Sequence, residues 1–152
     1  MIASPKLTKT PIQVFEWSGI TNLLISLSLA CFVASLFLVS LFTTGEDIRG
    51  FWILLLGWFG LLIFQFAWYA NMLNLLALLL LHKRPFISFM LSSLALLLAT
   101  QSFYFTEIPT STSGGKLFIK ELGLGFYLWY FAQLVFLIAT FIEIFQSKRS
   151  RQ

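Results

Sequence analysis

The sequence predicts an all-α integral membrane protein, a single four-helix bundle over residues 1–152 with both termini in the cytoplasm. Hydrophobic residues make up 59% of the chain and charged residues only 11%, a balance outside the range of soluble globular domains. Apolar runs of more than 20 residues are present, and the period-two alternation of a membrane β-barrel strand is missing. The membrane spans are therefore expected to be helices.

Four apolar stretches predict helices over residues 20–42, 51–81, 85–105 and 122–145, with an outer loop over 106–121. The second stretch would form a helix of roughly 46 Å at about 1.5 Å per residue, against a hydrocarbon core of about 30 Å. It is too long for one upright crossing and too short for two crossings with a turn. We expect it to cross once, with residues 51–56 tilted or lying in the membrane interface.

The basic residues predict the topology. Four spans with the N-terminus inside leave three basic residues outside, Arg49, Lys116 and Lys120, and seven in the cytoplasm, namely Lys6, Lys9, Lys83, Arg84, Lys148, Arg149 and Arg151. This distribution follows the positive-inside rule, and an additional crossing would reverse it. We therefore interpret the net charge of +4 as a topology signal and expect no nucleic-acid partner. The short 82–84 connection, followed by Pro85, predicts a tight hairpin between the second and third helices.

Small side chains mark the expected packing faces, because membrane helices associate where their backbones can approach closely. The third helix carries a stripe at alternating spacings of four and three residues: Ser88, Ser92, Ala95, Ala99 and Ser102. The first helix has a shorter stripe, Ser28, Cys31 and Ser35, and the fourth has Gly125, Ala132 and Ala139. These stripes predict the contacts of the bundle.

Polar and aromatic side chains within the spans are the candidate binding residues. On a regular second helix, Asn71 and Asn74 would share one face with Gly57 and Gly60. Amides in the bilayer need hydrogen-bond partners, and the third and fourth helices each offer a glutamine. The whole candidate cluster is Gln65, Trp68, Asn71, Asn74, Gln101, Tyr127, Trp129 and Gln133. We interpret it first as interhelical hydrogen bonding, worth about 0.6 to 2 kcal/mol per bond, and alternatively as an outward-facing pocket.

No residue pattern predicts catalysis, a metal site or a cofactor. Glu143 is the single ionisable residue within a predicted span, near the cytoplasmic end, where Lys148 or Arg149 is expected to screen it. The chain has one histidine, His82, and one cysteine, Cys31, so the several convergent ligands of a metal site are missing. We therefore expect a non-enzymatic protein without catalytic or metal-binding residues.

Two sequence patterns resemble a group of uncharacterised small four-span bacterial inner-membrane proteins. One is G-W-x-G followed by F-A-W-x-A-N, over residues 57–60 and 66–71, and the other is the glycine-rich and aromatic segment 123–129. Met72 stands where the group's pattern leads us to expect a proline. The resemblance implies a multi-pass protein of the bacterial inner (plasma) membrane and no particular activity.

Two classes of function remain open. The first is an accessory or interaction subunit that packs against a partner membrane protein or against itself within the lipid bilayer. The second is a homo-oligomeric pore, or a carrier that binds a lipid or small apolar solute in an outward-facing pocket. The sequence names neither the partner nor the ligand.

Overall fold

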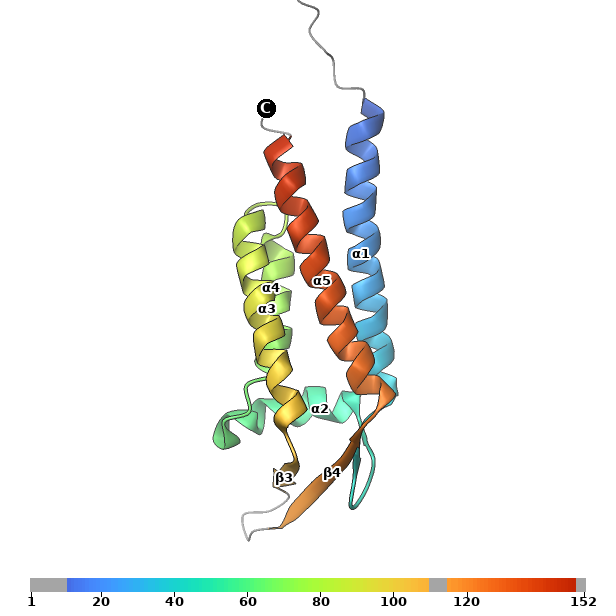
Figure 1. The fold of residues 1–152 in the computed structure, drawn as a ribbon, viewed down its shortest axis with the longest axis vertical. Coiled ribbons are helices and arrows are strands. Elements are labelled where there is room, and N and C mark those ends of the chain that lie inside the picture. Colours follow the sequence, from blue (N-terminus) through green and yellow to red (C-terminus); the bar gives the residue numbers. More distant parts are fainter. Residues whose placement is uncertain (1–10, 110–114, 150–152) are drawn as a thin grey trace, which may run out of the picture.

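The computed structural model describes residues 11–109 and 115–149, which are mostly helical. The tail 1–10, the turn 110–114 and residues 150–152 lie outside this range. Four helices run alongside one another (Figure 1): α1 (Pro11–Phe37), α3 (Tyr69–Leu80), α4 (Pro85–Thr100) and α5 (Leu124–Arg149). Among the described residues, three segments are long and apolar enough to cross a membrane, Gly19–Phe37, Pro85–Tyr104 and Leu124–Lys148. The apolar helix α3 is shorter, about 18 Å at 1.5 Å per residue.

The helices pack in an open row. The helix α1 packs along α5, α5 packs against α4, and α4 packs against α3, so α1 and α3 form the two edges. We call one end of the row the hairpin end, because it carries the 82–84 turn between α3 and α4 as well as the start of α1 and the end of α5 (Figure 1). We call the opposite end the sheet end.

The small-residue stripe of α4 lies on its buried face. Ser88, Ser92, Ala95 and Ala99 are each no more than 1% exposed, while Ser102 is only partly buried. Two of the serines also bond to neighbouring helices: Ser88 Oγ donates to the Ala77 carbonyl at 2.7 Å, and Ser92 Oγ lies 3.0 Å from Thr140 Oγ1. The stripe therefore brings α4 close to both α3 and α5.

The second apolar stretch is not one regular helix. It begins with α2 (Gly50–Leu56), continues as the 3-10 helix η1 (Gly57–Ile63), and resumes as α3 only at Tyr69. Between them, Phe64 adopts a left-handed backbone with φ of 55° and ψ of 27°. Figure 1 shows α2 lying across the sheet end of the row, as expected for residues 51–56, but the regular helix expected over 51–81 is wrong for residues 57–68.

A four-stranded antiparallel sheet covers the sheet end, in the order β2-β1-β4-β3. Strand β1 (Val39–Thr43) pairs with β2 (Ile48–Arg49), and β3 (Glu107–Pro109) pairs with β4 (Lys116–Leu122). The two hairpins join through β1 and β4, where Leu41 lies opposite Leu122. The sheet thus connects the end of α1 directly to the start of α5.

The fold is therefore mostly helical but not all-α. The first helix ends at Phe37, where a span to residue 42 was expected, and residues 39–43 form β1 instead. Much of the expected loop 106–121 forms β3 and β4. Hydropathy does not distinguish a short apolar strand from the last turns of a helix, which is why the sequence pattern placed these residues in a span.

Candidate functional site in a groove between helices

An amide ladder joins α3 to α5. Trp129 Nε1 donates a hydrogen bond to Asn71 Oδ1 at 2.9 Å, and Gln133 Nε2 lies 3.5 Å from the same oxygen. Asn74 Nδ2 donates to Gln133 Oε1. Four of the eight candidate residues thus form one chain of hydrogen bonds, in which Gln133 is the predicted amide partner of both asparagines.

The ladder has a fixed direction. An indole nitrogen can only donate, so the atom that Asn71 turns toward Trp129 must be its oxygen. Gln133 also turns its Nε2 toward that oxygen, which leaves its own Oε1 to accept from Asn74. Asn74 Oδ1 then stands at the end of the chain, buried and without a hydrogen-bond partner among the described residues. A buried acceptor without a donor costs about 1 to 3 kcal/mol, so Asn74 Oδ1 is the least well satisfied atom of the ladder.

A cavity of about 170 Å³ lies beside the ladder, between α1, α3 and α5. We call it the groove; its lining residues are Ile25, Ser28, Leu29, Phe32, Asn71, Asn74, Leu75, Leu78, Ala132, Gln133 and Phe136. Leu29, Leu75 and Leu78 are exposed, so the groove opens on the apolar flank of the helices, between the two edges of the row. Ser28 Oγ donates to the Ala132 carbonyl at 2.8 Å and so ties α1 to the floor formed by α5.

Three other candidate residues lie at the break in the second stretch. Gln101 spans the break with both ends of its amide: its Oε1 accepts from the Phe66 N–H at 2.8 Å, and its Nε2 donates to the Phe64 carbonyl at 2.7 Å. Trp68 Nε1 donates to the Leu54 carbonyl at 2.8 Å, which fixes α2 against the same segment. The Gln65 Oε1 atom is buried there without a partner in the described part of the chain. Gln101 and Trp68 thus stabilise irregular backbone, and none of the three side chains lines the groove.

Two glycines allow the break to fold tightly. An added Cβ at Gly57 would lie 2.4 Å from the Trp68 ring, and one at Gly60 would lie 2.5 Å from the Gln65 carbonyl oxygen. Both distances are far shorter than van der Waals contact. The G-W-x-G pattern thus has a structural role here, because its two glycines allow the close contacts at the break.

The remaining candidate, Tyr127, has an exposed side chain on α5 and does not line the groove. The eight residues are therefore distributed over the ladder, the break and the outer surface of α5. The groove opens on the side of the row, between α1 and α3.

At the hairpin end, Glu143 Oε1 lies 3.1 Å from His82 Nδ1. The sequence suggested Lys148 or Arg149 as the partner of this carboxylate, and the structure instead places the histidine of the α3–α4 turn there. The contact joins α5 to the hairpin. In residues 11–109 and 115–149, no group of three or more His, Cys, Asp or Glu side chains is arranged to hold a metal ion.

Comparison with known protein families, with curated protein sequences and with solved structures finds no significant match to this chain. The structure itself defines a mostly helical protein with three described segments long and apolar enough to cross a membrane, a hydrogen-bonded polar ladder between α3 and α5, and a small sheet at one end.

Proposed function

We propose that this chain is a non-enzymatic accessory protein of the bacterial inner membrane, whose groove binds a transmembrane helix of a partner membrane protein. In this proposal the chain crosses four times, with α1, α3 together with the preceding residues 64–68, α4 and α5 as its spans. The hairpin end faces the cytoplasm and the sheet end faces outward, which agrees with the placement of the basic residues.

The observation that carries the proposal is the groove between α1 and α3, the two edge helices of the row, which do not pack against each other along their length. Helix association in lipid depends on close packing at small residues and on hydrogen bonds between helices. The groove offers both, because Ser28 and Ala132 line it with small side chains, and Asn74 ends the ladder with an acceptor that has no partner among the described residues. A partner helix that presents a serine, threonine or amide side chain would pack against the small residues and donate a hydrogen bond to the ladder.

The size of the groove favours a side chain over a whole lipid. An engineered protein cavity of about 150 Å³ holds one benzene molecule. A cavity of about 170 Å³ therefore accommodates a ring-sized group, which fits one or two side chains of a helix that covers the groove. The same size supports the second candidate, a carrier of a small apolar solute.

Two matched leucines allow a direct test. Leu29 lies at the rim of the groove on α1 and is 58% exposed, whereas Leu97 is 70% exposed on α4 and does not line the groove. Wild type, Leu29→Trp and Leu97→Trp would be purified in mild detergent from the native host at native expression, and their complexes weighed by native mass spectrometry.

The accessory proposal expects a membrane-protein partner at fixed stoichiometry with wild type and Leu97→Trp, and loss of that partner with Leu29→Trp. Equal thermal unfolding of the two variants would show that the loss is not caused by misfolding. A chain that purifies alone, or a partner retained by Leu29→Trp, would contradict the proposal. If a small molecule travels with wild type and Leu97→Trp but not with Leu29→Trp, the groove binds a solute, and the carrier function is supported instead.

A further inference from the structure

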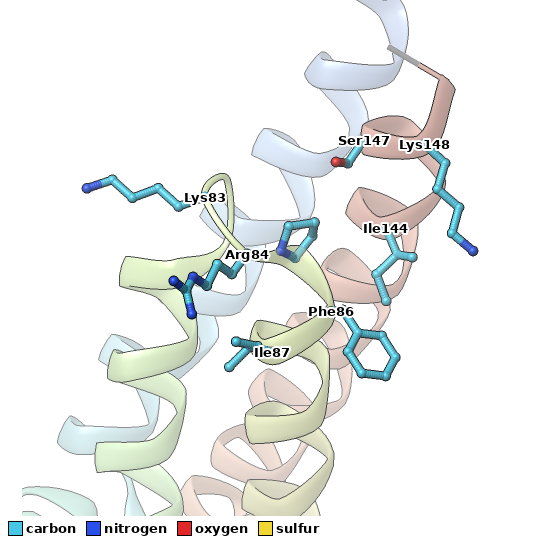
Figure 2. A pocket seen from close by; sticks show the side chains of 8 residues that line it. Lys83, Arg84, Phe86, Ile87, Ile144, Ser147 and Lys148 are labelled. Atoms are coloured by element: carbon cyan, nitrogen blue, oxygen red, sulfur yellow. The ribbon is translucent and has the colours of Figure 1, made fainter. Parts of the chain in front are cut away.

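A second hollow, of about 410 Å³, lies at the hairpin end, between the start of α4 and the last turns of α5 (Figure 2). Its lining residues are Lys83, Arg84, Pro85, Phe86, Ile87, Ile144, Ser147 and Lys148. None of them lines the groove described above. The hollow is thus a separate feature of the molecule.

The hollow exists because α5 is longer than the α3–α4 hairpin. At Glu143, α5 is level with the turn, where that side chain meets His82. The helix then continues to Arg149, about 9 Å further at 1.5 Å per residue, and so extends beyond the turn (Figure 1). Ile144, Ser147 and Lys148 on this extension form one wall, and the first residues of α4 form the other.

The charge of the hollow is positive. Lys83, Arg84 and Lys148 line it, and no acidic side chain is among its lining residues. The carboxylate of Glu143, the residue before Ile144 on α5, lies 3.1 Å from His82 Nδ1. Helix α4 begins here with Pro85 in its first turn and no side-chain cap, so its free N–H groups add partial positive charge.

Apolar surface adjoins these cations. Figure 2 shows Lys83 and Arg84 extending to one side, away from α5, and Lys148 extending to the other side, with Phe86, Ile87 and Ile144 between them on α4 and α5. Phe86 and Ile87 are exposed although they are large and apolar. Cations next to an apolar surface are complementary to an anionic phospholipid, because its phosphate is negatively charged and its acyl chains are apolar.

Among the described residues, the basic side chains at the sheet end are accompanied by acidic ones. The basic side chains Arg49, Lys116 and Lys120 share that end with four acidic ones, Glu46, Asp47, Glu107 and Glu121. Lys116 Nζ lies 2.6 Å from Glu107 Oε1, so its charge is already paired. The unpaired positive charge at the hairpin end is therefore a local property of the hollow.

We propose that this hollow binds the phosphate headgroup of an anionic phospholipid, with the acyl chains against Phe86, Ile87 and Ile144. Basic pockets between membrane helices on the cytoplasmic side bind such headgroups through charge-assisted hydrogen bonds. The site is independent of the groove and does not require the partner helix proposed above.

The test is a lipid titration of the full-length chain in mild detergent, followed by native mass spectrometry. The probes are phosphatidylglycerol, phosphatidylcholine with the same acyl chains, and inorganic phosphate. We expect one phosphatidylglycerol to bind at least tenfold more tightly than phosphatidylcholine, and inorganic phosphate not to displace it at equal concentration. Equal affinity for the two lipids, or displacement by inorganic phosphate, would overturn the proposal, the latter in favour of a site for free anions.

Matched variants assign the binding to the hollow. The triple variant Lys83→Gln, Arg84→Gln, Lys148→Gln is expected to lose at least tenfold in affinity for phosphatidylglycerol. The triple variant Arg49→Gln, Lys116→Gln, Lys120→Gln removes the same charge at the sheet end and is expected to bind as wild type does. Equal losses in the two would show a general charge effect and refute the site.

Two single variants keep the test decisive if the triple variant fails to fold. Lys148→Gln changes the flank that is not part of the hairpin turn, and we expect it to weaken phosphatidylglycerol binding severalfold. Phe86→Ser removes part of the apolar wall and is expected to do the same, whereas Leu97→Ser, an exposed site elsewhere on α4, is expected to have no effect. Unchanged binding in both Lys148→Gln and Phe86→Ser would refute the proposal.

Discussion

Gln101 replaces hydrogen bonds that the backbone loses where the second apolar stretch breaks. Its carboxamide accepts from the Phe66 N–H and donates to the Phe64 carbonyl, two groups that no regular helix satisfies there. Backbone groups in a membrane need such partners because lipid supplies none. The amide ladder has a different role. Its direction, which begins at the Trp129 donor, leaves Asn74 Oδ1 without a partner among the described residues.

Replacing Gln101 by leucine is expected to destabilise the protein by about 1 kcal/mol for each of the two backbone groups left unpaired, because the site is only partly buried. Thermal unfolding followed by circular dichroism in detergent micelles measures the change. Gln101→Glu retains the acceptor for the Phe66 N–H and loses the donor, so its midpoint should fall between those of wild type and Gln101→Leu. An unchanged midpoint for Gln101→Leu would show that these bonds do not hold the break together.

Replacing Trp129 by phenylalanine keeps a ring on α5 but removes the donor that orients the ladder. We expect a loss of about 0.6 to 2 kcal/mol in the free energy of unfolding, the range of interhelical hydrogen bonds. Urea unfolding of the purified chain measures it, with Trp52→Phe as the control because the Trp52 ring is exposed on α2. Equal effects of the two substitutions would contradict the orienting role of the indole N–H.

Among the elements, those with clear end signals were the ones that the sequence could predict. Pro85 marks the start of α4 in the sequence and in the structure, and the helical segment there ends at Tyr104, one residue from the expected boundary. The break at 57–68 lacks such a signal, because the left-handed residue is Phe64 and not a glycine. The apolar strand β1 was missed because its hydropathy continues that of α1 without interruption.

Residue spacing explains which part of the candidate site could be predicted from the sequence. Asn71 and Asn74 are three residues apart and Trp129 and Gln133 are four apart, so each pair lies on one face of its helix, and the sequence could indicate that α3 and α5 meet through them. Gln65, Trp68 and Gln101 entered the same candidate cluster as polar and aromatic residues within the predicted spans. In the structure Trp68 and Gln101 bond instead to the backbone at residues 54, 64 and 66 around the break.

The break itself predicts an unusual stabilising substitution. A left-handed backbone costs an L-residue roughly 1 to 2 kcal/mol, whereas glycine adopts it freely and loses about 0.5 to 1 kcal/mol in chain entropy. The Phe64 side chain is 77% exposed and contributes little packing within the chain. We expect Phe64→Gly to leave the melting temperature unchanged or raise it by a few degrees, and Phe59→Gly within η1 to lower it. A marked loss of stability in Phe64→Gly would contradict the strained conformation.

For the molecule as a whole, the proposed topology places the hairpin end and the sheet end on opposite sides of the membrane. Single cysteines at Lys120 and Lys83, introduced into a Cys31→Ser background, test this placement with a membrane-impermeant maleimide. We expect Lys120→Cys to react in spheroplasts and Lys83→Cys to react only after permeabilisation. Both positions are exposed, so a difference in labelling reports the membrane and not burial. Labelling of both from the outside would contradict the proposed membrane crossing by α4.

The pairing of Leu41 with Leu122 also affects how the protein is made. The two residues are separated by about 80 positions, so at roughly 5 to 20 residues per second the ribosome needs about 4 to 16 s after β1 emerges to supply its partner strand. During that interval α1 is made but α5, the helix against which it packs, is not. The packing of α1 on α5 and the joining of the two β-hairpins therefore form only after the rest of the chain has been synthesised.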